Sequence, residues 1–479
     1  MTQRVVIVGN GVAGIEAALI LRDREPSWEI TIVSEESDHF FSRTALMYVL
    51  CGQLSHRDIE PFERDLYERA RFRRVRARAT GIDAERKQVS LAGGLEPLGY
   101  DRLLIACGSR PRAAPWKGAG LRGVGHFVTM QDLEWLEREV HGGPGAGRPP
   151  RPDAHLEASD ASSPYAARAA AAQRRGQRAR EPSVIGGGLI GIEAVEVLVA
   201  AGLRPRFFVR EEWFWPMAIE PREAVWITDR LREHGVEVLL EREVSEIVGD
   251  DGGSVRAIRT GAREHPADLA VVCIGVVPNT EWLEGSAVER DGRGGIVVDD
   301  GLATTAEDVL AAGDCASVPF FDGSRQPEQL WYTARAQGRV AGRALAGERV
   351  KYDRGVWFNS AKLMDVEYTT AGLVNMRLED ERNWFFEERG PVRSTTRITL
   401  AGDRVAGFNL LGRRWDHEVL ARWIVERRTL AFTLDHLHEA LFDTEFVPPL
   451  RVPPEARKRS LDGPAPNPFR KESVAYPLR

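Results

Sequence analysis

A strand, a turn and a helix hinged on three glycines open the chain and constrain its fold more than any other feature. The apolar residues 5–8 run without polar interruption, as in a strand buried on both faces of a parallel sheet. A GxGxxG turn follows, and apolar residues then recur at helical spacing. In such a unit the helix N-terminus offers free N–H groups to a pyrophosphate, so the pattern predicts a dinucleotide site. The turn residues expected to line this site are Gly9, Gly11, Val12, Ala13 and Gly14.

An acidic pair follows the second strand of this unit. Ile30–Val33 is apolar, and Glu35 and Glu36 come directly after it. A carboxylate at this distance from a glycine turn accepts hydrogen bonds from a ribose. Both glutamates are therefore candidate cofactor-binding residues.

The same glycine pattern returns about 177 residues later, after the apolar start of the segment at Ser183. Two such units predict two dinucleotides, and two dinucleotides bound by one chain predict electron transfer between them. The turn residues of this second candidate site are Gly186, Gly188, Leu189, Ile190 and Gly191.

The residues after the second unit's next strand bear on the choice between NADH and NADPH. Phe207, Phe208 and Val209 lead into Arg210, Glu211 and Glu212. The glutamates would repel a 2′-phosphate and accept from a free 2′-hydroxyl, whereas an arginine at this place can accommodate the phosphate. We expect NAD(H) to be favoured over NADP(H), with Arg210 and Glu211 as cofactor-binding residues.

Composition is typical of a globular protein and limits the classes of partner that the chain is expected to bind. With 479 residues it is long enough for about three domains. A net charge of −6 does not indicate nucleic-acid binding, and without a run of 18 apolar residues no transmembrane helix is expected. The N-terminus enters a strand within four residues, which leaves no room for a signal peptide. We expect a cytoplasmic protein.

Cysteine and histidine spacing gives no sign of a metal site. The four cysteines lie far apart, and we expect them to be small buried side chains in a reducing cytoplasm. His436 and His438 stand two residues apart on an expected helix and so point to different faces. The sequence therefore predicts no metal ligands.

Periodicity and composition divide the chain into domains. We expect a first dinucleotide-binding domain from 1–115 and 283–348, a second dinucleotide-binding domain at 116–282, and a C-terminal α+β domain at 349–447. Residues 141–182 are rich in Gly, Pro, Ala and Arg and predict a flexible insertion, while 448–479 predicts an extended tail. Helices are expected at 62–72, 131–140, 330–345, 415–427 and 433–441, and C-terminal strands at 356–360, 367–374, 393–400 and 404–411.

Arginines alternate along residues 71–78. This pattern suits a strand with one solvated face at the edge of a sheet. It would also suit a positive patch that steers an acidic partner towards the chain. Both readings stay open.

With these motifs in order, the chain resembles the pyridine nucleotide-disulfide oxidoreductases. Within that family it is similar to ferredoxin and rubredoxin reductases, the apoptosis-inducing-factor group and the flavin part of NADH nitrite reductases. The resemblance covers roughly residues 3–135 and 182–348. It implies an α/β fold with two nested Rossmann-like domains (three-layer ββα) and a C-terminal α+β domain. It also implies FAD at the first glycine turn and NAD(P)H at the second.

The resemblance carries roles to individual positions. Glu35 matches the carboxylate that holds the adenosine ribose, Arg43 an arginine that contacts FAD, and Asp314 the aspartate at the ribityl and phosphate region. Two matches imply catalytic positions: Glu193 faces the nicotinamide–flavin contact, and Trp331 lies beside the flavin. The other cofactor-binding positions implied by the family motifs are Cys107, Gly108, Gly275 and Gly313.

Departures from the family pattern decide the subclass. The CxxxxC pair of disulfide-reducing members is missing, and Thr44 stands where single-cysteine members carry their redox thiol. A relay through mixed disulfides is therefore unavailable. Tyr48 replaces a lysine that pairs with the position of Glu193, which weakens that assignment, and Cys107 replaces a threonine.

Two functions remain open at this stage. The first is an FAD-dependent NAD(P)H oxidoreductase that passes electrons from NADH to a ferredoxin- or rubredoxin-like carrier or to a partner subunit. The second is a flavin-bound regulatory or interaction subunit resembling apoptosis-inducing factor, with slow NADH turnover. The chain is expected to form a homodimer or to be a subunit of a larger assembly.

Overall fold

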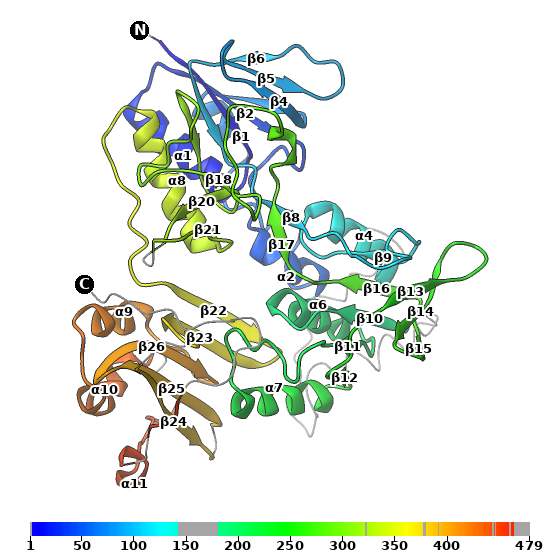
Figure 1. Cartoon of the computed structure of the whole chain (residues 1–479), viewed down its shortest axis with the longest axis vertical. Helices are drawn as coiled ribbons and strands as arrows, with labels where there is room; N and C mark the ends of the chain where they lie inside the picture. Colours follow the sequence, from blue (N-terminus) through cyan, green and yellow to red (C-terminus); the bar gives the residue numbers. More distant parts are fainter. Residues whose placement is uncertain are drawn as a thin grey trace. The chain divides into compact units, whose positions relative to one another are not determined.

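The computed structural model describes residues 2–141, 181–320, 323–376, 380–390, 392–442, 445, 447–458 and 461–463. These residues form two compact units (Figure 1). The first unit comprises Met1–Ala114, Gly125–Ala158 and Ile274–Arg354, and the second comprises Pro115–Val124, Ser159–Cys273 and Gly355–Arg479. Each unit is described by itself.

The first unit is built on a five-stranded parallel sheet in the order β19-β7-β1-β2-β3. Its strands β1 and β7 lie inside the sheet and are almost wholly apolar, because neighbours cover both faces. The register places Val5 opposite Ile30 on one side and Arg102 on the other. The strands are β1 (Arg4–Val8), β2 (Glu29–Ser34), β3 (Phe72–Arg76), β7 (Arg102–Ile105) and β19 (Val309–Ala311).

Two helices of this unit pack closely on each other. These are α1 (Val12–Arg24) and α8 (Trp331–Leu345). A Cβ atom at Gly342 would lie 2.7 Å from the carbonyl oxygen of Ala17, so only glycine fits there. Glu16 on α1 pairs with two arginines of α8. The packing of α8 on α1 thus brings the N-terminal end of α8 to the first glycine turn.

Short elements complete the first unit. Its helices are η1 (Arg43–Ala45), α2 (Leu46–Leu50), α3 (Leu66–Arg69), α4 (Met130–His141) and η2 (Glu281–Leu283). One small sheet contains β4 (Ala79–Asp83), β5 (Gln88–Leu91) and β6 (Leu98–Gly99). A second sheet pairs β8 (Ser109–Pro111) with β17 (Val276–Pro278). A third sheet contains β18 (Ile296–Val297), β20 (Ala316–Pro319) and β21 (Arg325–Pro327). β9 (Val124–Gly125) stands where the chain passes between the units.

The second unit repeats the strand–turn–helix plan. Its parallel strands are β12 (Glu237–Leu239), β11 (Arg206–Phe208), β10 (Pro182–Ile185) and β16 (Leu269–Val272), in that order. Helices α6 (Leu189–Ala200) and α7 (Pro221–Glu233) follow β10 and β11. An antiparallel sheet contains β13 (Glu246–Gly249), β14 (Val255–Thr260) and β15 (Arg263–Pro266).

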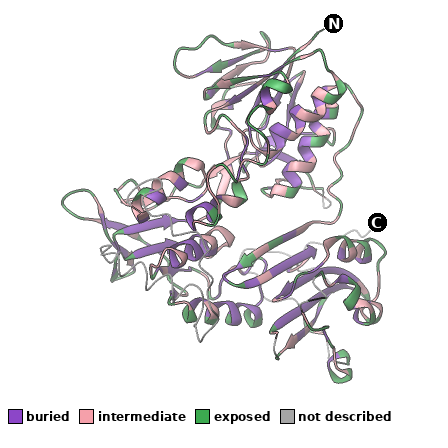
Figure 2. Ribbon diagram, turned by 180° about the vertical axis from the view of Figure 1, so that it is seen from behind, coloured by how far each residue is buried: buried purple, intermediate pink, exposed green. Residues whose placement is uncertain are grey.

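The second unit also holds a five-stranded antiparallel sheet in the order β22-β23-β26-β25-β24. Its most buried strands are β25 and β26, whose residues are buried along nearly their whole length (Figure 2). The elements are β22 (Phe358–Leu363), β23 (Val366–Gly372), β24 (Glu381–Glu388), β25 (Ser394–Ala401), β26 (Arg404–Leu411), α9 (His417–Val425), α10 (Leu430–His436), η3 (Leu437–Ala440) and α11 (Pro454–Arg457).

The predicted α/β class with two Rossmann-like folds and a C-terminal α+β region is confirmed. The predicted helices at 131–140 and 330–345 are also confirmed, by α4 and α8. The helix predicted at 62–72 is wrong in length, because only Leu66–Arg69 is helical. Strand β24 was missing from the prediction, although four of its eight residues are buried.

The predicted extended tail needs a correction. Ala456 is fully buried, and its carbonyl accepts a hydrogen bond from Trp384 Nε1 at 3.0 Å. Asp462 pairs through its backbone with Asn383 of β24. The start of this segment therefore packs on the sheet, because its few apolar residues fill the space beside β24. Most of the predicted insertion and the end of the predicted tail lie outside the described residues.

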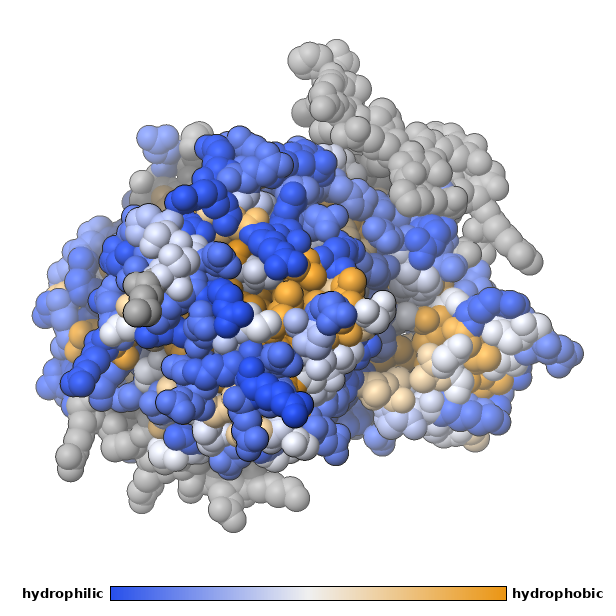
Figure 3. Space-filling view, turned by 90° about the horizontal axis from the view of Figure 1, so that it is seen from above, coloured by the Kyte–Doolittle hydropathy of each residue, from blue (hydrophilic) through white to orange (hydrophobic). Residues whose placement is uncertain are grey.

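The face seen in Figure 3 is mostly hydrophilic, as the composition of the chain leads us to expect. On the face seen in Figure 3, hydrophilic side chains cover most of the area and hydrophobic ones gather in limited regions. Among the residues that the structure describes, no helix is long and apolar enough to cross a membrane.

Candidate functional site

The first glycine turn joins β1 to α1 and is tightly packed. Gly9 has φ +120°, and its N–H donates to the carbonyl of Val33 at 2.8 Å. A side chain at Gly9 would overlap the carbonyl of Ala106, and one at Gly14 would overlap the carbonyl of Gly9. These two positions therefore require glycine for the turn and for the approach of the helix to the strand.

The middle glycine of this turn faces open space instead. A Cβ atom at Gly11 would meet nothing within 4 Å. Gly11 caps α1 without a side-chain hydrogen bond, and the helix begins at Val12 and Ala13 with no acidic residue in its first turn. The N-terminal N–H groups of α1 are thus available to an anionic group such as a pyrophosphate.

Glu36 and Arg43 form a two-pronged ion pair near this turn. The guanidinium donates to both carboxylate oxygens at 2.9 and 2.6 Å. Glu36 also accepts from the N–H of Met130 at 2.9 Å, and Arg43 donates to the carbonyl of Val128 at 2.7 Å. Although burial opposes it, the Arg43 charge lowers the pKa of Glu36. Both predicted site residues are therefore engaged with each other and with the start of α4.

Glu35, the other acidic candidate, is half exposed. Its carboxylate lies 4.0 Å from Arg78 Nε, and its side chain is 50% exposed. Because Glu36 is occupied by Arg43, Glu35 is the carboxylate of the pair that remains accessible to a ribose.

Asp314 lies at the carboxyl end of β19, close to the first glycine turn. A Cβ atom at Gly313 would lie 3.0 Å from Cβ of Ala13. Ser109 Oγ donates to Asp314 Oδ2 at 2.7 Å. Burial raises the pKa of Asp314, while Ser109 and Arg43 act to lower it. A half-buried carboxylate beside the helix N-terminus can accept hydrogen bonds from ligand hydroxyl groups.

Trp331, the first residue of α8, has a buried donor without a partner. Its Nε1 makes no hydrogen bond with any residue that the structure describes. The guanidinium of Arg335 lies 5.5 Å from the centre of its ring. A buried N–H without an acceptor costs free energy, so a bound group that supplies an acceptor would be favoured.

Two of the four cysteines meet at this end of the sheet. Cys107 is partly exposed and donates to the carbonyl of Asn279 at 3.1 Å. Cys315 is fully buried, and its thiol donates to the carbonyls of Ile105 and Ala312, both at 3.4 Å. The neighbouring Cys315 thiol and burial raise the pKa of Cys107. Burial is confirmed for Cys51, Cys273 and Cys315, whereas the prediction was wrong for Cys107 because it borders the open Gly108 turn, which has φ +67°.

The second glycine turn repeats the geometry of the first. Gly186 has φ +121°, and a side chain at Gly191 would overlap the carbonyl of Gly186. A Cβ atom at Gly188 would meet nothing within 4 Å. Helix α6 starts at Leu189 and Ile190. This turn can likewise receive a pyrophosphate.

The charged residues after β11 pair with each other. Arg210 donates to Glu211 Oε1 through Nη2 at 3.0 Å and through Nε at 3.2 Å. The Glu211 side chain is 14% exposed, and the Arg210 side chain is 58% exposed. The arginine that could accommodate a 2′-phosphate is therefore held by a carboxylate.

Two further candidates are Glu193 and Gly275. Glu193 lies on α6, and burial raises the pKa of its carboxyl to about 7. Gly275, with φ +97°, lies between β16 and β17 beside open space. Glu193 belongs to the second unit, and Gly275 belongs to the first.

Three of the alternating arginines, Arg73, Arg74 and Arg76, lie on the edge strand β3, in agreement with the predicted edge strand. Arg74 contacts His39 Nε2 at 2.9 Å, Arg76 donates to the carbonyl of Glu36 at 2.9 Å, and Arg78 lies near Glu35. Carboxylates oppose two of these charges, with Asp38 at 3.6 Å from Arg76 and Glu35 at 4.0 Å from Arg78, which weakens the interpretation of this segment as a steering patch.

Sequence reasoning missed the polar residues that support the first turn. Asn10 is buried, and its Oδ1 accepts from the hydroxyl of Tyr67 at 2.8 Å. Gln337 Oε1 accepts from the N–H of Gly313 at 2.8 Å, and Gln337 Nε2 donates to Glu328 at 3.1 Å. Asn10 could have been found from its place between two motif glycines, but Gln337 gives no local signal.

In the described parts of the chain no group of three or more His, Cys, Asp or Glu side chains could hold a metal ion. The residues of the first unit do fit FAD, because they include an open glycine turn, a half-buried aspartate and an indole N–H without an acceptor. Together with the second glycine turn, they define a protein of the two-dinucleotide flavoprotein class.

Comparison with known proteins gives the family. The family model described as pyridine nucleotide-disulphide oxidoreductase matches residues 3–338, and the chain belongs to this family. It is 30% identical over 350 residues to the ferredoxin reductase component of chlorobenzene dioxygenase from Cupriavidus sp. (strain PS12), covering 73% of this chain and 75% of that protein. It is 26% identical over 381 residues to an NADH oxidase of Methanocaldococcus jannaschii, covering 77% and 76%.

A solved structure agrees in fold. The covalent complex of putidaredoxin reductase with putidaredoxin contains a chain that matches with a TM-score of 0.73 at 22% identity, covering 89% of this chain and 93% of that one. The chain is therefore an FAD-dependent NAD(P)H oxidoreductase.

Proposed function

We propose that this enzyme takes a hydride from NADH and delivers electrons to a small one-electron carrier protein of the ferredoxin or rubredoxin type. The observation that carries the proposal is Thr44, which follows Arg43 where a redox thiol would stand. Cys51, the next cysteine along the chain, is buried. Without a thiol relay, electrons leave the enzyme directly for an acceptor, as in a relative named for its ferredoxin reductase role.

The first unit would hold FAD. The N–H groups at Gly11, Val12 and Ala13 would bind its pyrophosphate, Glu35 its adenosine ribose, and Asp314 its ribityl hydroxyls. When bound, FAD accepts a hydride and releases electrons singly. Trp331 Nε1 would donate to an acceptor on the same cofactor.

The second unit would bind NADH in preference to NADPH. The turn Gly186–Gly191 would hold the pyrophosphate, and Glu211 would accept from the 2′-hydroxyl. Because Arg210 is already paired with Glu211, a 2′-phosphate would have to break that pair and approach a carboxylate. This supports NADH.

Anaerobic reduction tests the proposal. Under anaerobic conditions, stoichiometric NADH should bleach the purified enzyme loaded with FAD. Ferredoxins and rubredoxins should then reoxidise the reduced enzyme faster than dissolved oxygen does in a separate aerobic assay. Reduction by NADH with no carrier faster than oxygen would contradict the proposed acceptor. Failure to bind FAD would contradict the proposed cofactor site.

A second candidate is a subunit of a larger assembly. Large apolar side chains are exposed in the second unit, including Val425 at 71% and Phe442 at 70%. Such side chains are favoured at interfaces with another chain. Light scattering would separate a homodimer from a monomer, and negligible NADH turnover with salt-sensitive co-purification of a partner would favour the regulatory alternative. A cytoplasmic location stays a prediction.

A further inference from the structure

A strained tryptophan contacts the second glycine turn. Trp215 has φ +48°, a backbone region that bulky residues rarely adopt. Its N–H donates to the carbonyl of Gly187 at 2.9 Å, and its own carbonyl accepts from Ala218 and Ile219 at 3.1 and 3.0 Å. Trp215 therefore fixes the peptide group that joins Gly187 to Gly188, within the turn. Such strain persists only where the surroundings hold it.

One of the groups holding Trp215 comes from the C-terminal sheet of the same unit. The ring of Tyr368 on β23 lies 5.2 Å from the ring of Trp215, with their planes 56° apart. Tyr368 is buried, and its hydroxyl donates to Asn409 Oδ1 on β26 at 3.0 Å. The hydrogen bond of its hydroxyl group to β26 thus fixes the position of the Tyr368 ring against Trp215.

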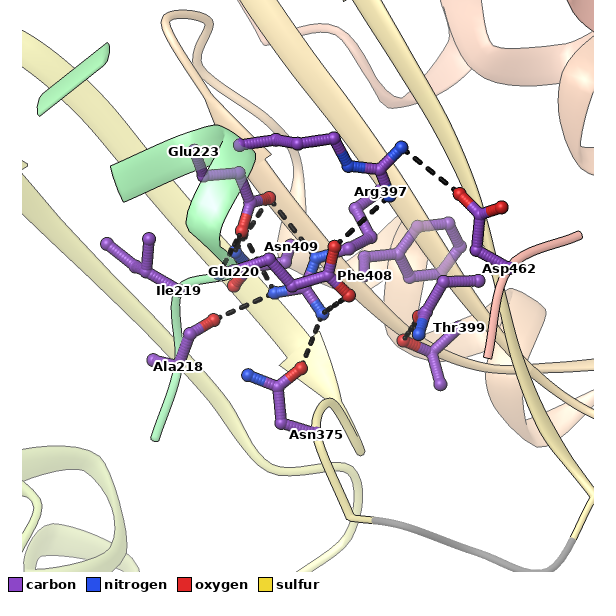
Figure 4. Close-up of polar contacts among 12 residues, drawn as sticks. Ala218, Ile219, Glu220, Glu223, Asn375, Arg397, Thr399, Phe408, Asn409 and Asp462 are labelled. Atoms are coloured by element: carbon purple, nitrogen blue, oxygen red, sulfur yellow. Dashed lines mark hydrogen bonds and ion pairs between the residues drawn. The ribbon is translucent and has the colours of Figure 1, made fainter. Parts of the chain in front are cut away.

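A second support is a buried ion pair (Figure 4). Arg397 on β25 donates to Glu223 Oε1 and Oε2 at 3.2 and 3.1 Å, and both side chains are fully buried. Asn409 Nδ2 donates to the same two oxygens at 3.1 Å. Arg397 also donates to Asn375 at 2.8 Å. Nearly every polar atom around the Glu223 carboxylate is therefore supplied by the C-terminal sheet.

The same arginine reaches the loop that carries Trp215. Arg397 Nη2 donates to the carbonyl of Ala218 at 2.8 Å. Glu223 accepts from the N–H of Glu220, the residue that caps α7, at 2.9 Å. The loop from Trp215 to Glu220 is therefore held at its start by Tyr368 and at its end by Arg397.

We propose that Arg397 and Tyr368 are positioning residues for the pyridine nucleotide, and that they act through Trp215 on the peptide between Gly187 and Gly188. The N–H groups of a glycine turn bind a pyrophosphate only when their peptide planes point at it. The C-terminal sheet thus sets the affinity of a nucleotide site that its own residues do not form. This inference rests on the proposed NAD(P)H site at Gly186–Gly191.

Steady-state kinetics of the FAD-loaded full chain test the proposal. Arg397→Gln and Tyr368→Ala should each raise the KM for NADH about tenfold, as loss of a supporting contact does at other ligand sites, with kcat at saturating NADH and FAD content within about twofold of the wild type. Tyr368→Phe keeps the ring against Trp215 and should recover most of the affinity. Ferricyanide serves as the acceptor, so no carrier protein is needed.

A matched variant separates positioning from general destabilisation. Leu420 is fully buried in the apolar core of the same sheet, and its side chain has no polar atom that could join the hydrogen bonds described above. Leu420→Ala should lower the melting temperature and leave the KM unchanged. An equal rise of KM in Leu420→Ala, or an unchanged KM in folded Arg397→Gln and Tyr368→Ala, would overturn the proposal.

The affinity of the same variants for NAD⁺, measured by calorimetry, tests the positioning role separately from the proposed function, because no carrier protein is involved. Wild-type binding of NAD⁺ that weakens in Arg397→Gln and Tyr368→Ala supports the positioning role even if no carrier protein is reduced. Wild-type binding of NAD⁺ that these substitutions leave unchanged overturns the positioning role alone. No binding of NAD⁺ by the wild type overturns both.

Discussion

Glu36 and Arg43 bind each other through two parallel hydrogen bonds of 2.9 and 2.6 Å, seven residues apart in the chain. Pairs with this geometry are the stronger kind of ion pair. Because Arg43 also donates to Val128 and Glu36 accepts from Met130, the pair connects the residues after β2 with the start of α4.

Loss of this pair should weaken FAD binding. Glu36→Gln leaves Arg43 without its counter-charge, and we expect the dissociation constant of FAD to rise about 10- to 100-fold, equivalent to roughly 1–3 kcal/mol. The dissociation constant is measured from the quenching of FAD fluorescence when FAD is titrated with the apoprotein. Glu63→Gln, which removes an exposed pair with Arg69, is the control and should change nothing. Unchanged FAD affinity in Glu36→Gln would contradict a role of the Glu36–Arg43 ion pair in FAD binding.

Removal of the carboxylate after β11 should change nucleotide preference. Glu211→Ser frees Arg210 from its partner and removes a negative charge, so the ratio of kcat/KM for NADPH to that for NADH should rise at least tenfold. Glu243→Gln removes an exposed carboxylate of the same unit and is the control. If the ratio of kcat/KM for NADPH to that for NADH rose equally in both variants, the cause would be the change in net charge and not the loss of Glu211.

Glu193 should make the stability of the protein depend on pH. Burial raises the pKa of its carboxyl from 4.5 to about 7, so the folded state favours the neutral form. The stabilising contribution is complete below about pH 4.5 and is lost as pH rises through about 7. Glu193→Gln should therefore stabilise the nucleotide-free protein at pH 8.5 relative to pH 5, by on the order of 1–3 kcal/mol.

Urea unfolding of wild type and Glu193→Gln at the two pH values measures this difference. The comparison between variants cancels the contributions of all other titrating groups. Parallel stability curves for the two proteins across this range would rule out a buried neutral Glu193.

The close packing of α8 on α1 should not tolerate a methyl group. In Gly342→Ala, Cβ would meet the Ala17 carbonyl at 2.7 Å and Cβ of Ile20 at 2.8 Å, so we expect a destabilisation of about 1–3 kcal/mol. FAD content should fall as well, because Trp331 lies at the start of the same helix. Gly292→Ala, where a Cβ meets nothing within 4 Å, is the control. Equal melting temperatures for both variants would contradict the packing argument.

Local patterns were sufficient for the glycine turns and for the helices with a strong apolar face. Gly9 and Gly186 have the positive φ that their motifs predict, because a turn between a strand and a helix leaves room for no side chain. The prediction of a helix over 62–72 was wrong in length, because apolar spacing alone does not determine where a helix begins and ends. β24 was missed because the apolar run Trp384–Phe386 lies within a charged segment.

The sequence by itself determined that two dinucleotide turns exist, because GxGxxG encodes its own backbone geometry and helix dipole. It also determined that no thiol follows Arg43. Only the tertiary structure decided that Glu36 serves Arg43, that Cys107 meets Cys315, and that Arg397 reaches Glu223 across 174 residues. Cys107 and Cys315, like Arg397 and Glu223, are distant in the chain, whereas Glu36 and Arg43 are only seven residues apart. The register and packing that bring the distant pairs together are properties of the whole fold.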